Sequence, residues 1–207
     1  MVVGGGEVAL RKVQGLLSAG ARVRVISPEV EEELAVLAGA GRIDWQRKTY
    51  APEDIAKSLL VFAATDDRVA QQQICRQAAR SGQLVNVADD PACCDFQVPA
   101  TFRRGDLTIA IATGGKSPAV AAMIRGRLEE EFGPEYVVLL NLMAMVRQVV
   151  AGSLSQEERK KIYKKILHDD IVKWIRRGEI DVLRTHLQSV LGPGMEAEIN
   201  GMMQDIS

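Results

Sequence analysis

Residues 2–9 read Val2-Val3-Gly4-Gly5-Gly6-Glu7-Val8-Ala9, a short apolar run followed by three glycines and the start of a helical pattern. The spacing Gly-x-Gly-x-x-Ala is typical of a turn that joins a strand to a helix and binds the pyrophosphate of a dinucleotide. Glycine at the first two positions permits a tight turn and close approach of the backbone, and Ala9 permits close helix packing. A purely structural glycine turn is the alternative.

The next hundred residues place this turn in a repeating strand–helix pattern. Apolar residues recur at helical spacing from Ala9 until Gly20, and residues 29–38 and 69–80 are further predicted helices. The predicted strands are residues 23–26, 43–46, 59–64 and 84–88. The strand at residues 43–46 alternates like an edge strand, and the last two read as buried strands. The order predicts an α/β fold with a Rossmann-like, doubly wound parallel sheet.

Beyond residue 90 the pattern changes to a hairpin and then to helices. Residues 96–99 and 107–112 are predicted strands, joined by the turn Arg103-Arg104-Gly105-Asp106. Ser117-Pro118 is an N-cap with proline at the first helical position, and it predicts a helix to about residue 132. Further predicted helices are residues 136–150, a basic segment that opens with a capping box at Ser155, and residues 179–190. The tail to residue 207 is weakly specified.

Composition excludes several classes of protein. The chain has 207 residues, of which 47% are hydrophobic and 26% charged, so disordered and fibrous chains are excluded. The longest apolar run, residues 59–64, is far too short for a membrane span and no signal peptide is visible, so we expect a cytoplasmic protein without a membrane partner. Three cysteines and two histidines without metal-ligand spacing predict neither a disulfide scaffold nor a zinc site.

Two basic segments lie within a chain whose net charge is −1. Residues 101–127 hold five basic residues against one acid, and residues 159–177 hold eight against two. A polyanionic partner would be met there, and a solvated helix face is the alternative for the second segment. The overall charge argues against a chain built for nucleic acid.

The carboxyl ends of the strands predict the cofactor site, because ligands of doubly wound sheets bind there. Ser27-Pro28 stands where an NAD enzyme commonly has an acidic residue, so the choice between NAD and NADP stays open. Ser27 or Glu29 could bind the ribose, and Arg24 could hold a 2′-phosphate or be merely exposed. Asp66 and Asp67 could instead cap the next helix. The residues predicted to line the site are Gly4, Gly5, Gly6, Glu7, Val8, Ser27, Pro28, Thr65 and Asp66.

Six motifs in a fixed order are more specific than the glycine loop alone. They are VVGGGxVAxRK at residues 2–12, AGA at 19–21, AATD at 63–66, NVAD at 86–89, FxxPA at 96–100 and IATGGxSP at 111–118. Together they closely resemble the precorrin-2 dehydrogenase family, which includes the amino-terminal module of siroheme synthases. The resemblance covers residues 2–132 strongly, and the helical remainder by length and character.

This resemblance implies an NAD-dependent oxidation of precorrin-2 to sirohydrochlorin and, in some members, insertion of ferrous iron to give siroheme. It also implies three parts: an NAD-binding Rossmann domain at residues 1–96, a small α+β dimerisation region at 97–132 and an all-helical domain at 133–207. The active site would lie at a homodimer interface. Because the tetrapyrrole nitrogens are the final ligands of the iron, no protein metal site is required.

The family's key aspartate, proposed to act in dehydrogenation and chelation, falls on Asp89 in the NVAD motif. A carboxylate near the nicotinamide can take a proton or stabilise developing positive charge, and a turn-capping role before Pro91 is the alternative. The carboxylates of precorrin-2 would suit the basic residues of segment 101–127. The residues predicted to bind substrate are Asn86, Arg103, Arg104, Thr113, Gly114, Gly115, Lys116 and Ser117.

The remaining candidate groups have plain interpretations. His168 and His186 are expected to be satisfied or solvated histidines rather than chelatase bases. Cys93-Cys94 is expected to be a pair of small packing residues rather than a soft-metal or redox site. Relatives have a longer leader before the glycine loop and some have a fused methyltransferase domain, so we expect a trimmed or omitted start and methylation by another protein.

Two other functions compete with the dehydrogenase. A nucleotide-sensing regulatory Rossmann module without turnover would need neither Asp89 nor the basic pair Arg103-Arg104. A nucleic-acid scaffold would rest on segment 159–177 alone, and it would leave the glycine loop unexplained.

Overall fold

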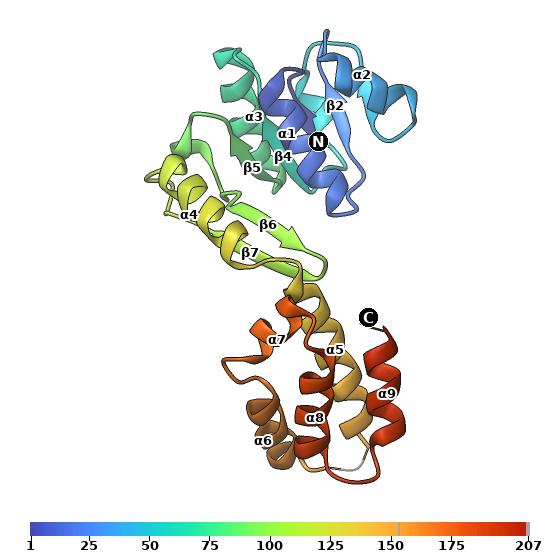
Figure 1. The fold of residues 1–207 in the computed structure, drawn as a ribbon. Helices are drawn as coiled ribbons and strands as arrows, with labels where there is room; N and C mark the ends of the chain where they lie inside the picture. Colours follow the sequence, from blue (N-terminus) through green and yellow to red (C-terminus); the bar gives the residue numbers. More distant parts are fainter. Residues whose placement is uncertain (153, 206–207) are drawn as a thin grey trace. The chain divides into compact units, whose positions relative to one another are not determined.

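The computed structural model describes residues 1–152 and 154–205, and the chain divides into two compact units, Met1–Val98 and Pro99–Ser207 (Figure 1). The boundary lies close to the one predicted between residues 96 and 97. The second unit contains both the hairpin region and the C-terminal helices, so the further division at residue 132 stays a prediction.

A five-stranded parallel sheet of order β3-β2-β1-β4-β5 forms the centre of the first unit. The strands are β1 (Val2–Val3), β2 (Arg24–Ile26), β3 (Asp44–Gln46), β4 (Leu60–Ala63) and β5 (Leu84–Val87). The helices are α1 (Glu7–Ser18), α2 (Glu32–Gly39) and α3 (Arg68–Ser81), with 3-10 turns η1 (Pro52–Ile55) and η2 (Pro91–Cys93). The predicted Rossmann-like, doubly wound sheet and its third strand at an edge are confirmed.

Both faces of this sheet are covered by helices. Successive side chains of a strand point to opposite faces, so the two residues of β1 belong to two different cores. Val2 packs in a cluster with the α1 residues Ala9 and Val13 and with Leu34 of α2. Val3 packs in a cluster with Ile74 and Ala78 of α3. This two-sided burial explains why the central strand is apolar throughout.

The helix predicted at residues 29–38 begins three residues later than expected, at Glu32. The turn before it is held by the glycine loop, because the Glu31 N–H donates to the carbonyl oxygen of Gly5 over 2.8 Å. Residues 28–31 therefore serve the loop that follows β1 rather than the helix.

The prediction for Cys93 is wrong, because Cys93 of η2 is disulfide-bonded to Cys75 of α3, with the two Cα atoms 6.2 Å apart. This spacing is ordinary for a disulfide. Cys94 is a free, half-buried thiol. The pairing depends on how α3 packs beside the turn after β5, which the number of cysteines does not reveal.

We expect the denatured, unreduced chain to show one reactive thiol, that of Cys94, and three after reduction. In the matched variant Cys75→Ser, two thiols should react without reduction, because Cys93 loses its partner. Titration with a chromogenic thiol reagent measures the number. Three reactive thiols in the unreduced, unaltered chain would contradict the disulfide.

The second unit begins with an antiparallel hairpin of β6 (Ala100–Arg104) and β7 (Leu107–Ile111). The hairpin confirms the predicted topology, but residues 96–99 are not a strand, and the turn consists of residues 105 and 106 only. Gly105 has φ +53°, which a two-residue hairpin turn requires and glycine adopts without strain. Arg103 and Arg104 consequently lie in β6 rather than in the turn.

Helices make up the rest of this unit. They are α4 (Pro118–Glu131), α5 (Glu135–Val150), α6 (Gln156–Ile166), α7 (Ile171–Arg177), α8 (Ile180–Leu191) and α9 (Glu196–Asp205). The weakly specified tail contains α9, and the α9 residues Ile199, Met202 and Met203 are buried in the common helical core. None of the helices in residues 1–152 and 154–205 is both long and apolar enough to cross a membrane.

The basic segment 159–177 is divided between α6 and α7. The predicted capping box is confirmed, since the Ser155 hydroxyl accepts from the Glu158 N–H and the Glu158 carboxylate accepts from the Ser155 N–H. Most of its lysines are exposed, which supports the interpretation as a solvated helix face. Arg176 is exposed as well, and it pairs with the buried carboxylate of Glu135 at the start of α5.

Candidate functional site

The carboxyl ends of the five parallel strands bring separate parts of the sequence to one edge of the sheet. The residues that follow the strands are Gly4 after β1, Ser27 after β2, Arg47 after β3, Ala64 after β4 and Ala88 after β5. Since β1 lies between β2 and β4, the glycine loop stands at the reversal of strand order, which is the usual ligand crevice of a doubly wound sheet.

The glycine loop has the shape of a pyrophosphate cradle. A Cβ atom on Gly4, whose φ is +117°, would lie 2.0 Å from the carbonyl oxygen of Ala64, and a Cβ on Gly5 would lie 2.0 Å from that of Glu29. A Cβ on Gly6 would meet no atom within 4 Å. The first two glycines are therefore required by packing, whereas the third leaves open space.

Helix α1 begins at this open space. Gly6 is its N-cap and provides no side-chain cap, so the first N–H groups of the helix are free to bind an anion. Gly6, Glu7 and Val8 are exposed, as a cofactor-contacting turn requires. The residues present thus fit a dinucleotide pyrophosphate.

Ser27 and Pro28 form a turn pressed onto this loop. Ser27 is only 7% exposed, and its hydroxyl donates to the carbonyl oxygen of Glu29 over 2.5 Å. The indole Nε1 of Trp45 donates to the Ser27 carbonyl oxygen over 3.0 Å. The Ser27 hydroxyl therefore organises the turn, and Pro28 is the exposed member of the pair.

Thr65, Asp66 and Asp67 follow β4. The Thr65 hydroxyl accepts from the Asp67 N–H over 3.2 Å, and a Cβ on Gly4 would lie 3.1 Å from the Thr65 nitrogen. Asp67 caps α3, since its carboxylate accepts from the N–H groups of Val69 and Ala70. Thr65 thus borders the glycine loop, Asp66 is exposed, and the capping role belongs to Asp67.

Asp89 lies in the turn that follows β5. Its φ is +61°, a left-handed conformation that aspartate tolerates better than most residues. Asp89 is exposed, and in the described part of the chain no hydrogen bond or ion pair joins its carboxylate to another residue. The carboxylate therefore does not cap the turn before Pro91.

A network of hydrogen bonds fixes the segment after Asp89 to β5. The Asn86 amide donates to the carbonyl oxygen of Phe96 over 3.0 Å, and the Val85 N–H donates to the Asp95 carboxylate over 2.9 Å. The Cys94 sulfur accepts from the Val87 N–H over 3.2 Å. Asn86, predicted to bind substrate, thus has a structural bond of its own.

The predicted substrate residues of the second unit form two groups. Thr113 closes the loop before α4: its hydroxyl donates to the Ser117 carbonyl and accepts from the Ser117 N–H. Gly114 and Gly115 have φ of +60° and +76°, Lys116 is exposed, and the Ser117 hydroxyl caps α4 by accepting from the Val120 N–H. Two consecutive left-handed residues explain why both are glycine.

The arginine pair forms the other group. Arg103 and Arg104 are neighbours in β6, and their side chains therefore point to opposite faces of the hairpin. Arg104 donates to the carbonyl oxygen of Glu129 in α4 over 3.1 Å, so part of its hydrogen-bonding capacity serves the packing of the hairpin on α4. Arg103 is exposed.

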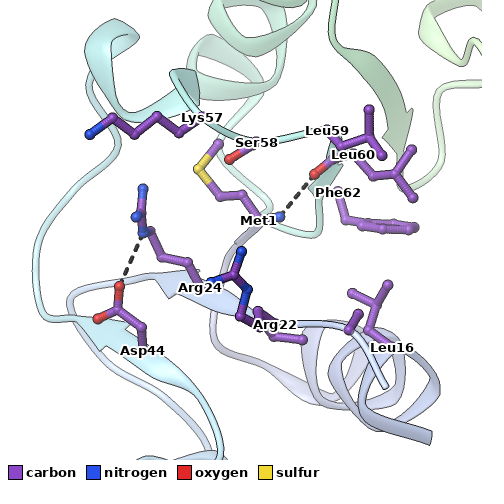
Figure 2. A pocket seen from close by; sticks show the side chains of 12 residues that line it. Met1, Leu16, Arg22, Arg24, Asp44, Lys57, Ser58, Leu59, Leu60 and Phe62 are labelled. Atoms are coloured by element: carbon purple, nitrogen blue, oxygen red, sulfur yellow. Dashed lines mark hydrogen bonds and ion pairs between the residues drawn. The ribbon is translucent and has the colours of Figure 1, made fainter. Parts of the chain in front are cut away.

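A cavity of about 700 Å³ lies at the other edge of the sheet (Figure 2). Its lining includes Met1, Leu60, Arg24 and Asp44 at the amino-terminal beginnings of the strands, and Figure 2 shows the Arg24–Asp44 ion pair beside it. Ligands of doubly wound sheets bind at the carboxyl ends instead, so this cavity is not the cofactor site. The suggestion that Arg24 holds a 2′-phosphate is wrong for the same reason.

Lys12 of α1 and Arg47, which directly follows β3 at the carboxyl edge of the sheet, are basic residues that sequence reasoning did not select as site residues. Burial, and then the charge of Arg11, lower the pKa of Lys12, whose Nζ lies 5.6 Å from the centroid of the Phe62 ring. Arg47 could have been found as a basic residue directly after an edge strand.

The two histidines lie together in the helical part of the second unit. The rings of His168 and His186 have centroids 4.6 Å apart, and both contact Trp174. Burial, and then the charge of His168, lower the pKa of His186. Within residues 1–152 and 154–205 no three histidine, cysteine, aspartate or glutamate side chains group as metal ligands.

Two family models match the chain. One is described as putative NAD(P)-binding and matches residues 1–100, and the other is described as the central part of a sirohaem biosynthesis protein and matches residues 104–131. The first covers the sheet and the Asp89 turn. The second covers the loop from Thr113 to Ser117 and α4.

The chain is also similar in sequence to known proteins. The chain is 36% identical over 199 residues to a siroheme synthase of Nitrosococcus oceani, and 38% identical over 172 residues to siroheme synthase 1 of Aeromonas salmonicida. These matches cover 96% and 82% of this chain, but it spans only 42% and 36% of the relatives' lengths.

Among solved structures, the precorrin-2 dehydrogenase SirC resembles the chain with a TM-score of 0.74 and 27% identity, over 91% of this chain and 92% of that one. Both the order of modules and the nearly complete structural match agree with the six sequence motifs. The chain belongs to the family formed by precorrin-2 dehydrogenase and the amino-terminal modules of siroheme synthases.

Proposed function

We propose that this chain oxidises precorrin-2 to sirohydrochlorin, with NAD as the hydride acceptor. The observation that carries the proposal is the exposed, unpaired carboxylate of Asp89 at the same sheet edge as an open glycine cradle. The names of the relatives, siroheme synthase and precorrin-2 dehydrogenase, support the substrate class.

The glycine loop and the ends of β2 and β4 would hold the cofactor. The N–H groups at the start of α1 bind the pyrophosphate, the turn at Ser27 and Pro28 adjoins the adenosine side, and Thr65 adjoins the nicotinamide side, because β2 and β4 flank β1 on opposite sides. Bound NAD supplies the acceptor for a hydride.

Asp89 would assist the loss of a proton from the substrate. Oxidation of precorrin-2 removes a hydride and a proton, and the Asp89 carboxylate can take the proton or stabilise positive charge before it leaves. Asp89 follows β5, which neighbours β4, so it stands on the nicotinamide side of the cofactor site. The bonds from Asn86, Val85 and Cys94 keep its turn in place.

The basic residues of the second unit would bind the carboxylates of the tetrapyrrole. Arg103 and Lys116 are exposed, and the N–H groups around Gly114 and Gly115 add hydrogen-bond donors in a turn that suits anions. Arg104 would act indirectly, through its hydrogen bond to the Glu129 carbonyl oxygen in α4.

Incubating the chain with precorrin-2 and NAD under anaerobic conditions tests the proposal. Sirohydrochlorin absorbance and NADH absorbance should rise together, one NADH for each substrate oxidised. If the chain binds NAD but neither absorbance changes, the regulatory nucleotide-sensing module becomes the better interpretation.

Insertion of ferrous iron, as a substrate, is the second reaction that the family resemblance implies. The same Asp89 carboxylate could accept the pyrrole protons that the iron displaces. Adding ferrous iron to sirohydrochlorin and the chain should accelerate siroheme formation beyond the protein-free rate, and an unchanged rate would limit the chain to oxidation.

We also expect a homodimer formed by residues 97–132. Val120 and Met123 on α4 are 42% and 49% exposed, and Val98 is 52% exposed. Apolar surface of this kind favours association. Light scattering at micromolar concentration should give twice the 22.6 kDa chain mass, and a monomeric mass would contradict the dimer.

A further inference from the structure

The carboxyl end of β2 is where a doubly wound sheet distinguishes NAD from NADP. An acidic side chain there holds the ribose hydroxyls of NAD, and its charge would repel a 2′-phosphate. In this chain the position is Ser27, which is buried and whose hydroxyl is bonded to Glu29 within its own turn. The position itself therefore contributes no negative charge.

Arg47 brings a positive charge to this turn from the neighbouring strand. Its Nε donates to the carbonyl oxygen of Pro28 over 3.3 Å, and its guanidinium lies 5.7 Å from the ring centroid of Trp45. The Trp45 indole is itself hydrogen-bonded to the Ser27 carbonyl oxygen, so the ring beside the guanidinium is held in place. In the described residues the terminal guanidinium nitrogens of Arg47 make no hydrogen bond to another side chain, and the residue is exposed.

The turn below Arg47 is in direct contact with the glycine loop. The Glu31 N–H donates to Gly5, and a Cβ on Gly5 would collide with the carbonyl oxygen of Glu29. The adenosine ribose of a dinucleotide lies between the pyrophosphate loop and the end of the second strand. A 2′-phosphate on that ribose would consequently come within reach of Arg47.

Other basic residues nearby are already engaged. Lys48 pairs with the Asp54 carboxylate, and Arg24 pairs with Asp44 at the opposite edge of the sheet. The exposed carboxylates of Glu29 and Glu31 are the charges that would oppose a phosphate. The balance between Arg47 and these two glutamates therefore decides the specificity.

We propose that Arg47 is a specificity-determining residue that binds the adenosine 2′-phosphate, so that the chain accepts NADP as well as NAD. This proposal rests on the proposed dinucleotide site. A guanidinium presents paired N–H groups that match phosphate oxygens, and with Nε held by Pro28 the terminal nitrogens can form such a pair.

Calorimetric titration of the purified chain with NAD, NADP and the fragment 2′,5′-ADP tests the proposal without turnover. We expect the Kd for NADP to be within about tenfold of that for NAD. Arg47→Gln should weaken NADP and 2′,5′-ADP binding by about tenfold or more and leave NAD binding nearly unchanged, since only the phosphate contact is lost. Arg42→Gln, at an exposed arginine on the amino-terminal side of β3, is the matched control and should change neither.

Several outcomes would overturn the proposal. The first is that NADP binds to the unaltered chain more than about a hundredfold more weakly than NAD does. The second is that Arg47→Gln weakens the binding of both dinucleotides equally. The third is that NADP binds only to the Glu29→Gln variant. In each of these cases the NAD site itself stands. If NAD does not bind at all, the proposed dinucleotide site fails and Arg47 loses its role with it.

Discussion

Asp89→Asn is expected to fold and to bind NAD as the unaltered chain does, yet to oxidise precorrin-2 at least about a hundredfold more slowly, the low end for a lost general base. The amide keeps the size of the side chain but carries no charge and cannot take a proton. Asparagine also tolerates the left-handed backbone at this position, where φ is +61°, so the turn should keep its shape.

The structure makes this variant a clean test of chemistry. In residues 1–152 and 154–205 nothing is bonded to the Asp89 carboxylate, so its replacement breaks no contact within the protein. Asp90→Asn is the matched control: its carbonyl oxygen, which the substitution keeps, accepts from the Cys93 N–H over 3.2 Å. Single-turnover rates with saturating NAD, beside NAD affinities, measure the effect for both variants.

Near-normal oxidation by Asp89→Asn would remove Asp89 from catalysis. Equal losses in Asp89→Asn and Asp90→Asn would point to the shape of the turn instead. A loss confined to Asp89→Asn, with unchanged NAD affinity, is the result that the proposed function requires.

The residues at the carboxyl edge of the sheet could be predicted, because the order and direction of the strands alone determine which residues lie there. Once residues 2–9 are placed on the central strand and the next strands run parallel, the residues that end each strand must gather at one side. The sequence-based prediction therefore placed Thr65 and Asp89 at the same edge of the sheet as the glycine loop, and they lie there in the structure. Such residues follow from strand order and need no knowledge of side-chain packing.

Contacts between side chains of different elements could not be predicted in this way. The bond from Arg47 to Pro28 depends on the register of β3 against β2, and the Cys75–Cys93 disulfide depends on how α3 meets the turn after β5. Which of Asp66 and Asp67 caps α3 depends on the residue at which the helix begins, and α3 begins at Arg68, directly after Asp67. Sequence reasoning could name both aspartates as candidates but had no means of choosing.

Local sequence signals also failed where tertiary packing supplies the stability. Residues 96–99 look like a strand but pair with none, and Phe96 instead packs edge-on against Phe62 of β4, with ring centroids 5.4 Å apart. Helix α9 carries few helix signals, yet its Ile199, Met202 and Met203 are buried against the other helices. Short segments of this kind take their conformation from the surface they cover.

Gly6→Val is expected to leave the first unit folded and to weaken NAD binding by at least about a hundredfold. A Cβ at position 6 meets no protein atom within 4 Å, and the φ of −86° is one that valine adopts, so the fold should tolerate the side chain. The same space is where the pyrophosphate must approach the first N–H groups of α1. Valine would therefore displace charge-assisted hydrogen bonds that contribute about 1.5–3 kcal/mol each.

The neighbouring glycines explain why position 6 is the informative one. Alanine at Gly4 or Gly5 would bring Cβ to 2.0 Å from a backbone carbonyl oxygen, so loss of NAD binding there could follow from a distorted sheet edge. Gly15→Val is the matched control, because it adds the same side chain to the same helix in open space away from the loop. Calorimetry gives the affinities, and circular dichroism with thermal unfolding checks the fold. NAD affinity that is unchanged in a folded Gly6→Val chain would mean that the pyrophosphate does not lie over this loop, whereas a loss shared with Gly15→Val would trace the effect to helix α1 rather than to the cradle.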